Sequence, residues 1–207
     1  MHSYYHTLVT IDALSTSLSS GALNEVIRAN LQQDSIIRQI FHNEYHFDNN
    51  KLAEGVAYIR QQEHACLEYI QSAQFSRARR AFGSLIHTIQ DYFSHTNFVR
   101  LFNIGQNIEI MAPLEIIQMI NENKLIKSHM VHIPIDLFKL PPTIFLLIRD
   151  HLPKNSHAYM NLDTPLSGID FLKSYQVSVG MTKNALDQIY QSVSIQNHQA
   201  FKTFLGK

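Results

Sequence analysis

Apolar residues recur every three or four positions through most of the chain, which is the pattern of amphipathic helices. The spacing predicts helices within residues 6–14, 22–31 and 35–41. Two longer helices are predicted at about residues 51–72 and 75–99, and the second of them has one broad apolar face. The apolar residues of that face are Ala78, Phe82, Leu85, Ile86, Ile89 and Phe93.

The second half of the chain is less regular. Pro113 opens a predicted helix at residues 113–125, because proline is favoured in the first turn. Prolines between residues 125 and 168 predict loops and short helices, and residues 168–193 predict a long amphipathic helix. No strand pattern persists and no repeat is visible. The predicted fold class is therefore all-α, with residues 1–207 forming one compact multi-helix domain.

Composition narrows the kinds of site that this domain can hold. The chain has 207 residues, with 17 basic and 17 acidic side chains, so it lacks the positive charge expected for duplex nucleic acid. It has 12 histidines but one cysteine, Cys66, which excludes an internal disulfide and a cysteine-rich zinc site. Any bound metal ion must be held by histidine and carboxylate, which suits zinc among other ions.

The sequence also bears on location. Its first residues contain no basic start followed by an apolar run, so no signal peptide is predicted and a cytoplasmic location is expected. A mature secreted chain would show the same pattern. The most apolar stretch, residues 130–152, is interrupted by Asp136, Lys139 and the pair Pro141 and Pro142, so no transmembrane segment is predicted.

The stretch LIHTIQDYFSHTNF, residues 85–98, contains the most informative spacing. His87, Asp91 and His95 are four residues apart, so on a helix they form one row with neighbouring Cβ atoms about 5–6 Å apart. Such a row can hold a metal ion, with the central carboxylate bridging two ions. A solvated histidine–aspartate pair is the alternative. The adjacent apolar face favours metal, since burial makes an unpaired charge costly.

Two further stretches supply candidate ligands. Residues 34–48 contain Asp34 and His46 among several histidines and carboxylates, although HFDN alone is also typical of an Asx-type turn. His6 lies at the start of an amphipathic helix, where a lone histidine is most often a surface or core residue.

Taken together, GSLIHTIQDYFSHTNFVRL, EYHFDN and HTLVTIDAL resemble the zinc-dependent phospholipase C superfamily, which includes bacterial phospholipases C and single-strand-specific nucleases. The likeness is strongest to its Het-C-like branch and covers residues 6 to 100 well. It implies an all-helical fold with one to three zinc ions. The metal ligands that it implies are His6, Asp34, His46, His87, Asp91, His95, His157 and Asp163.

The resemblance also implies a reaction. Clustered zinc ions make hydroxide available at neutral pH, so the expected function is phospholipase C-like hydrolysis of a phosphodiester, with Asp34 and Asp91 as the catalytic residues. Two alternatives remain open: a Het-C-like membrane or cell-death effector whose metals are mainly structural, and a single-strand-specific nuclease. The expected partner is a phospholipid or another phosphodiester. Residues 101–154 are expected to form a variable insertion near the site, and residues 133–148 within it to contact a membrane surface or pack in the core.

Overall fold

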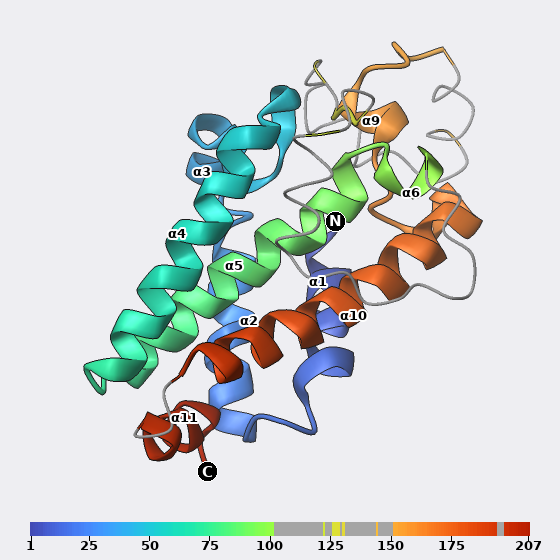
Figure 1. Ribbon diagram of the computed structural model, residues 1–207. Helices are drawn as coiled ribbons and strands as arrows, with labels where there is room; N and C mark the ends of the chain where they lie inside the picture. Colours follow the sequence, from blue (N-terminus) through green and yellow to red (C-terminus); the bar gives the residue numbers. More distant parts are fainter. Residues whose placement is uncertain (102–121, 123–125, 129, 131–143, 145–150, 194–196) are drawn as a thin grey trace.

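The computed structural model describes residues 1–101, 122, 126–128, 130, 144, 151–193 and 197–207 (Figure 1). The main helices are α1 (Ser3–Leu14), α2 (Ser20–Gln32), α3 (Ile36–Phe41), α4 (Leu52–Gln71), α5 (Phe75–His95), α6 (Phe98–Leu101), α9 (His157–Met160), α10 (Ile169–Ser192) and α11 (His198–Leu205). Short 3₁₀ helices are η1 (Asn43–Tyr45), η2 (Asp48–Asn50) and η4 (Pro165–Ser167). The described residues form no strand, which confirms the all-α class.

The predicted helices that fall within the described part of the chain are present, with small changes at their ends. The clearest change is at the end of α5, which was predicted to reach residue 99 but ends at His95. Thr96 takes an extended conformation, with φ −104° and ψ 166°, and forms an isolated antiparallel bridge with Ser128. The next residue, Asn97, donates its backbone N–H to the Lys127 carbonyl. This pairing with a distant segment replaces the helical hydrogen bonds, so Phe98–Leu101 begins again as the separate helix α6.

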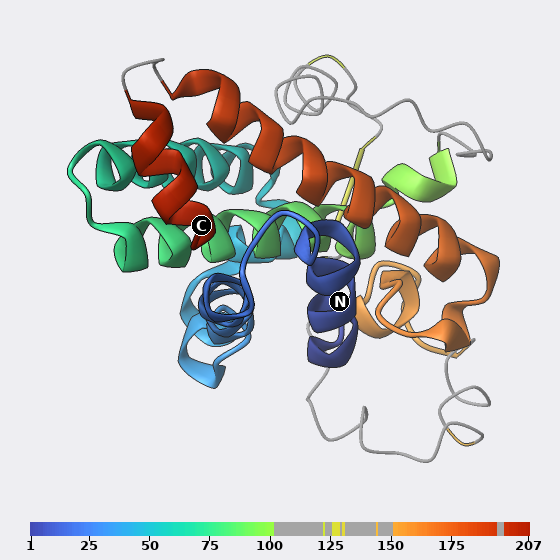
Figure 2. The ribbon, with the colours of Figure 1, turned by 90° about the horizontal axis from the view of Figure 1, so that it is seen from below.

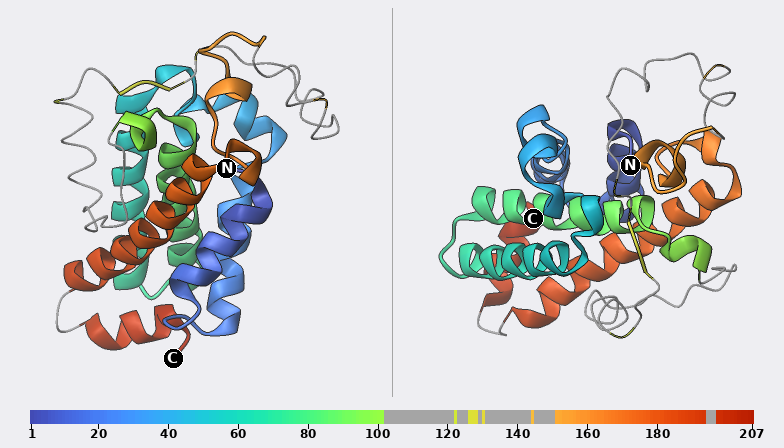
Figure 3. Two further views of the ribbon diagram at one scale, coloured as in Figure 1. Left: turned by 90° about the vertical axis from the view of Figure 1, so that its right-hand side faces the viewer. Right: turned by 90° about the horizontal axis from the view of Figure 1, so that it is seen from above.

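Helix α5 lies at the centre of the molecule. Figure 2 shows α1 and α2 on one side of it and α4 and α10 on the other, and the same layers appear in Figure 3. Because helices cover α5 from both sides, its residues from Leu85 to His95 are all buried. The predicted broad apolar face is therefore confirmed, and the polar residues of this helix are enclosed together with it.

Gly83 allows α2 and α5 to approach each other at backbone distance. A Cβ atom built at this position would lie 2.5 Å from the Val26 carbonyl oxygen and 2.6 Å from Ala29 Cβ. Any larger residue would push the two helices apart. This close crossing brings the end of α2, and the residues that follow it, next to the middle of α5.

A tight turn connects α3 to α4 and directs side chains toward the end of α5. Phe47, Asn49 and Asn50 have positive φ angles of 56°, 52° and 58°. The Phe47 ring is fully buried, packs edge-on against Tyr92, and lies so close to Gly55 that a Cβ atom there would be 2.6 Å from the ring. The buried ring anchors the turn, and His46 and Asp48 on either side of it point into the same interior.

Some predictions concern residues outside the described part of the chain. The helix at 113–125 except Glu122, most of the insertion at 101–154, and the membrane contact at 133–148 except Ile144 belong there. Of the helices that are described, none has both the length and the apolar character needed to cross a membrane. The cytoplasmic location stays a prediction.

Candidate metal centre

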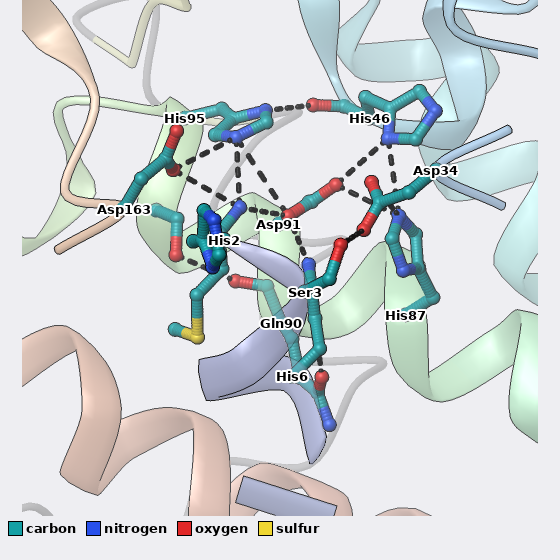
Figure 4. Close-up of polar contacts among 12 residues, drawn as sticks. His2, Ser3, His6, Asp34, His46, His87, Gln90, Asp91, His95 and Asp163 are labelled. Carbon is teal, nitrogen blue, oxygen red and sulfur yellow. Dashed lines mark hydrogen bonds and ion pairs between the residues drawn. The ribbon is translucent and has the colours of Figure 1, made fainter. Parts of the chain in front are cut away.

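The row predicted on α5 is present and buried. His87 and Asp91 have no exposed surface and His95 is 5% exposed, and the three side chains lie on one side of the helix (Figure 4). They face α1 and the turn between α3 and α4. A carboxylate in such a position is stable only if cations or hydrogen-bond donors surround it.

Four of the predicted ligands meet around Asp91. The nitrogen and oxygen atoms that His6, Asp34, His87 and Asp91 offer all lie within 4.8 Å of one another. Asp91 uses both oxygens: Oδ1 lies 3.1 Å from His6 Nε2, and Oδ2 lies 3.0 Å from His87 Nε2. Asp34 Oδ1 lies 3.7 Å from His87 Nε2. We call these four residues the Asp91 cluster. They come from α1, the segment after α2, and α5.

Buried amide groups fix the orientation of the two imidazoles. His6 Nδ1 donates to Gln90 Oε1 at 2.6 Å, and His87 Nδ1 donates to Asn30 Oδ1 at 3.0 Å. Gln90 is itself oriented because its amide nitrogen donates to Thr182 Oγ1 at 3.1 Å. An amide oxygen only accepts, so each Nδ1 carries the proton and each Nε2 presents an electron pair. Both electron pairs point toward the Asp91 carboxylate.

This arrangement places acceptors against acceptors. His6 Nε2 is buried and has no hydrogen-bond partner, although Asp91 Oδ1 is 3.1 Å away. His46 Nδ1 lies 2.8 Å from Asp91 Oδ2 and 3.1 Å from His87 Nε2 and donates to this pair, which leaves the electron pair of its own buried Nε2 without a partner. A cation between these atoms would satisfy the electron pairs. The donor set therefore fits a metal ion.

The protonation states favour the same chemistry. Burial lowers the pKa of the His87 imidazole to about 4, although Asp91 acts in the opposite direction. Burial alone would raise the pKa of the Asp91 carboxyl, but the charges of His95 and the Met1 amino group outweigh it and hold that pKa well below its usual range. Near neutral pH the cluster thus contains a neutral imidazole and an ionised carboxylate, which are the forms that bind metal.

A second group of side chains lies beside the first. Ligand atoms of Asp48, His95 and His157 also lie within 4.8 Å of one another, and Asp163 contacts both histidines, at 3.2 Å from His95 Nε2 and 3.5 Å from His157 Nε2. The Met1 amino group lies 3.0 Å from Asp163 Oδ1 and contacts Asp91 Oδ1. Burial opposes its charge, but Asp163 and Asp91 raise the pKa of this amino group to about 11. A positive charge is thus already present between the two groups.

The eight predicted ligands therefore lie close together: four form the Asp91 cluster, His46 contacts it, and His95, His157 and Asp163 belong to the adjoining group. Sequence reasoning missed the residues that orient them. Asn30 and Gln90 are polar residues within apolar helix faces, which was the available signal. Asp48 belonged to the histidine- and carboxylate-rich stretch at residues 34–48, for which a turn was the alternative interpretation, but it was not among the predicted ligands.

Comparison with known proteins identifies a different family from the one expected. Residues 2–126 match the family model of the VWA7 N-terminal domain. The chain is similar to von Willebrand factor A domain-containing protein 7 from Rattus norvegicus, with 30% identity over 46% of this chain and 12% of the relative. The Mus musculus protein is 32% identical over 39% of this chain and 9% of the relative. The Homo sapiens protein is 29% identical over 47% of this chain and 11% of the relative. The chain thus spans only about a tenth of these relatives. No solved structure matches it.

These matches correct the functional interpretation of the sequence. The predicted membership of the zinc-dependent phospholipase C superfamily is wrong, and with it the phosphodiester hydrolase and its Het-C-like effector and nuclease alternatives. The catalytic roles of Asp34 and Asp91 depended on that activity. The reason for the error is physical. A helix that buries a histidine–carboxylate row needs this spacing whatever reaction, if any, it supports, so the motif reports a buried polar centre and not a substrate.

Proposed function

Since this chain belongs to the VWA7 N-terminal domain family, we propose that the domain is a metal-binding module that holds one zinc ion in the Asp91 cluster. His6, Asp34, His87 and Asp91 are its ligands, and His46 positions Asp91. These ligands belong to segments that are far apart in the sequence. Binding therefore stabilises the packing of α1 and the end of α2 against α5.

One observation carries this proposal. The Nε2 atoms of His6 and His87 are 3.1 and 3.0 Å from the two oxygens of a buried carboxylate, while amide oxygens take the proton on each Nδ1. Without a metal ion, the unpartnered electron pair of His6 Nε2 faces Asp91 Oδ1 in a region closed to water, although the Met1 amino group contacts the same oxygen. Histidines that bind metal typically donate their second N–H to such an oxygen, which orients the ring.

The donor types and the burial support zinc in a structural role. Two imidazole nitrogens and two carboxylate oxygens match the four ligands that zinc takes, and imidazole is a less common ligand of magnesium or calcium. Catalytic zinc sites keep one position open for water or substrate. Here the side chains of His6, His87 and Asp91 are 0% exposed, and Asp34 is 15% exposed. Such a closed set is typical of an ion that stabilises the fold.

Elemental analysis of protein purified without a histidine tag tests the proposal. We expect about one zinc per chain in the wild type and little in Asp91→Asn, which keeps the size of the side chain but removes its charge. His64→Ala is the matched control, because His64 is 74% exposed and contacts Glu68 on the surface of α4. This variant should keep its zinc.

A thermal measurement covers the case in which metal is lost during purification. Chelated wild-type protein is titrated with zinc while its melting temperature is followed. Free zinc at 100 times Kd should stabilise the fold by about 2.7 kcal/mol, which for a chain of this size raises Tm by about 5–11 °C. Absence of zinc after purification, together with no rise in Tm for chelated protein that is still folded, would overturn the proposal.

A further inference from the structure

A groove with a different chemistry lies between α2, α4 and α5, next to α3. Its volume is about 500 Å³. Three arginines line it, Arg38 from α3 and Arg77 and Arg80 from α5, together with the amide side chains of Gln32, Gln61 and Gln62. Alanines from α2, α4 and α5 also contribute to its wall. No acidic residue lines it among those that the structure describes.

The arginines of this groove are not neutralised. Arg77 donates to Gln74 Oε1 at 2.7 Å and lies over the Tyr69 ring, and Arg80 donates to the Ser76 carbonyl at 3.4 Å. Within the described residues, neither of them nor Arg38 forms an ion pair with a carboxylate. Arg79, between Arg77 and Arg80, does: it pairs with Glu25 at 3.1 Å. Unpaired guanidinium groups that share a concave surface attract anions, and their planar shape suits carboxylate.

Beside the groove, α3 presents large apolar side chains to solvent. Ile36, Ile37, Ile40 and Phe41 are 67%, 70%, 60% and 72% exposed, and none of the residues of α3 is buried. The spacing of i and i+4 makes Ile36 a neighbour of Ile40, and Ile37 a neighbour of Phe41. An exposed apolar group of this kind is typical of an interaction site. Arg38 belongs to the same short helix, so the apolar group and the arginine groove adjoin.

We propose that this surface binds a peptide segment of a protein partner that carries both acidic and large apolar side chains. Carboxylates of the peptide pair with Arg38, Arg77 and Arg80, and its apolar side chains cover α3. The glutamines supply donors and acceptors for the peptide backbone. The adjoining apolar surface distinguishes this ligand from a simple anion, which would make no use of α3.

The groove is separate from the metal centre, although both involve α5. Ser84 lines the groove and accepts a hydrogen bond from Gln33 Nε2 at 2.6 Å, and Gln33 Oε1 accepts one from the Tyr58 hydroxyl at 3.3 Å. Gln33 is 1% exposed and Tyr58 is 9% exposed, and none of the four residues of the Asp91 cluster lines the groove. Peptide binding does not depend on the zinc proposal, and the two can fail independently.

Selection from a displayed library of random nine-residue peptides tests the inference without assuming a ligand. Peptides captured by the wild-type chain should be enriched in Asp and Glu together with large apolar residues. The double variant Arg38→Gln, Arg80→Gln should not produce this enrichment. Arg60→Gln, on an exposed part of α4 outside the groove, is the matched control for a lost positive charge and should select the same peptides.

Fluorescence anisotropy with the best peptide then separates the two parts of the surface. The arginine double variant should weaken binding at least tenfold, and so should Ile37→Ser, Phe41→Ser; all these side chains are largely or partly exposed, so the fold should persist. Excess inorganic phosphate is the competitor. No enrichment, or enrichment without acidic residues, would overturn the inference. So would binding that phosphate abolishes but that the α3 variant leaves unchanged, because the groove would then be a site for small anions.

Discussion

Gly83→Ala is a sensitive test of the packing that positions the metal centre. The added Cβ atom would lie 2.5 Å from the Val26 carbonyl oxygen, 2.6 Å from Ala29 Cβ and 3.0 Å from the Asn30 backbone nitrogen. Two of these three atoms belong to the backbone of α2, so no side-chain rotation can remove the overlap. Helix α2 has to move away from α5.

The expected change in stability combines two opposing effects. Alanine favours the helical state over glycine by about 1 kcal/mol. Forcing an extra methyl group into a packed contact costs about 1–3 kcal/mol, and the upper part of that range applies here because a helix backbone must shift. The net loss in the free energy of unfolding is therefore about 1–2 kcal/mol. For a chain of this length, Tm should fall by about 2–8 °C.

Circular dichroism melts and urea titrations measure this change directly. Gly21→Ala is the control, since Gly21 also lies in α2 but a Cβ atom there would have nothing within 4 Å. The free energy of unfolding of that variant should equal that of the wild type or exceed it by up to about 1 kcal/mol. If Gly83→Ala matched or exceeded the stability of the wild type, the close approach of α2 and α5 would be refuted.

Two other predictions concern single side chains. Burial raises the pKa of the Cys66 thiol far above its ordinary value. The buried thiol therefore contributes fully to stability below the unfolded-state pKa of about 8.5. Above that pH, the free energy of unfolding falls by up to about 1.4 kcal/mol per pH unit, because only the unfolded chain loses the proton. Urea titrations between pH 8 and 10 should show this decline, and Cys66→Ala should reduce it; equal slopes would contradict the burial. Ser19 caps α2 by accepting the Ala22 backbone N–H at 3.3 Å, so Ser19→Ala should cost about 1 kcal/mol. An unchanged urea midpoint would show that this cap contributes nothing.

The helical fold could be predicted because the sequence repeats its apolar residues at helical spacing. The end of α5 could not, because it depends on the pairing of Thr96 and Asn97 with residues 127 and 128, which are distant in the chain. Helical periodicity reports local structure only. It contains no information about which remote segment will compete for the backbone at the end of a helix.

For the candidate site, the row on α5 follows from spacing alone, since His87, Asp91 and His95 share one helix. Asp34 and His46 were candidates because residues 34–48 are rich in histidine and carboxylate, and the resemblance to a family that proved to be wrong singled them out; both lie against this row. The roles of Asn30 and Gln90 could not be predicted, because each depends on a contact between helices. An asparagine or glutamine in an apolar face signals a buried partner but does not identify it.

The position of α10 has a consequence for how much of the chain can fold by itself. The family match ends at residue 126, whereas α10 begins at Ile169, packs against both α1 and α5, and buries Val177, Met181 and Ile189. A polypeptide ending at residue 126 would leave the central helix uncovered along this side. The autonomous folding unit is therefore longer than the region by which the family is recognised. A fragment containing residues 1–126 should acquire its cooperative unfolding transition only when a second fragment containing α10 is added, as in fragment complementation.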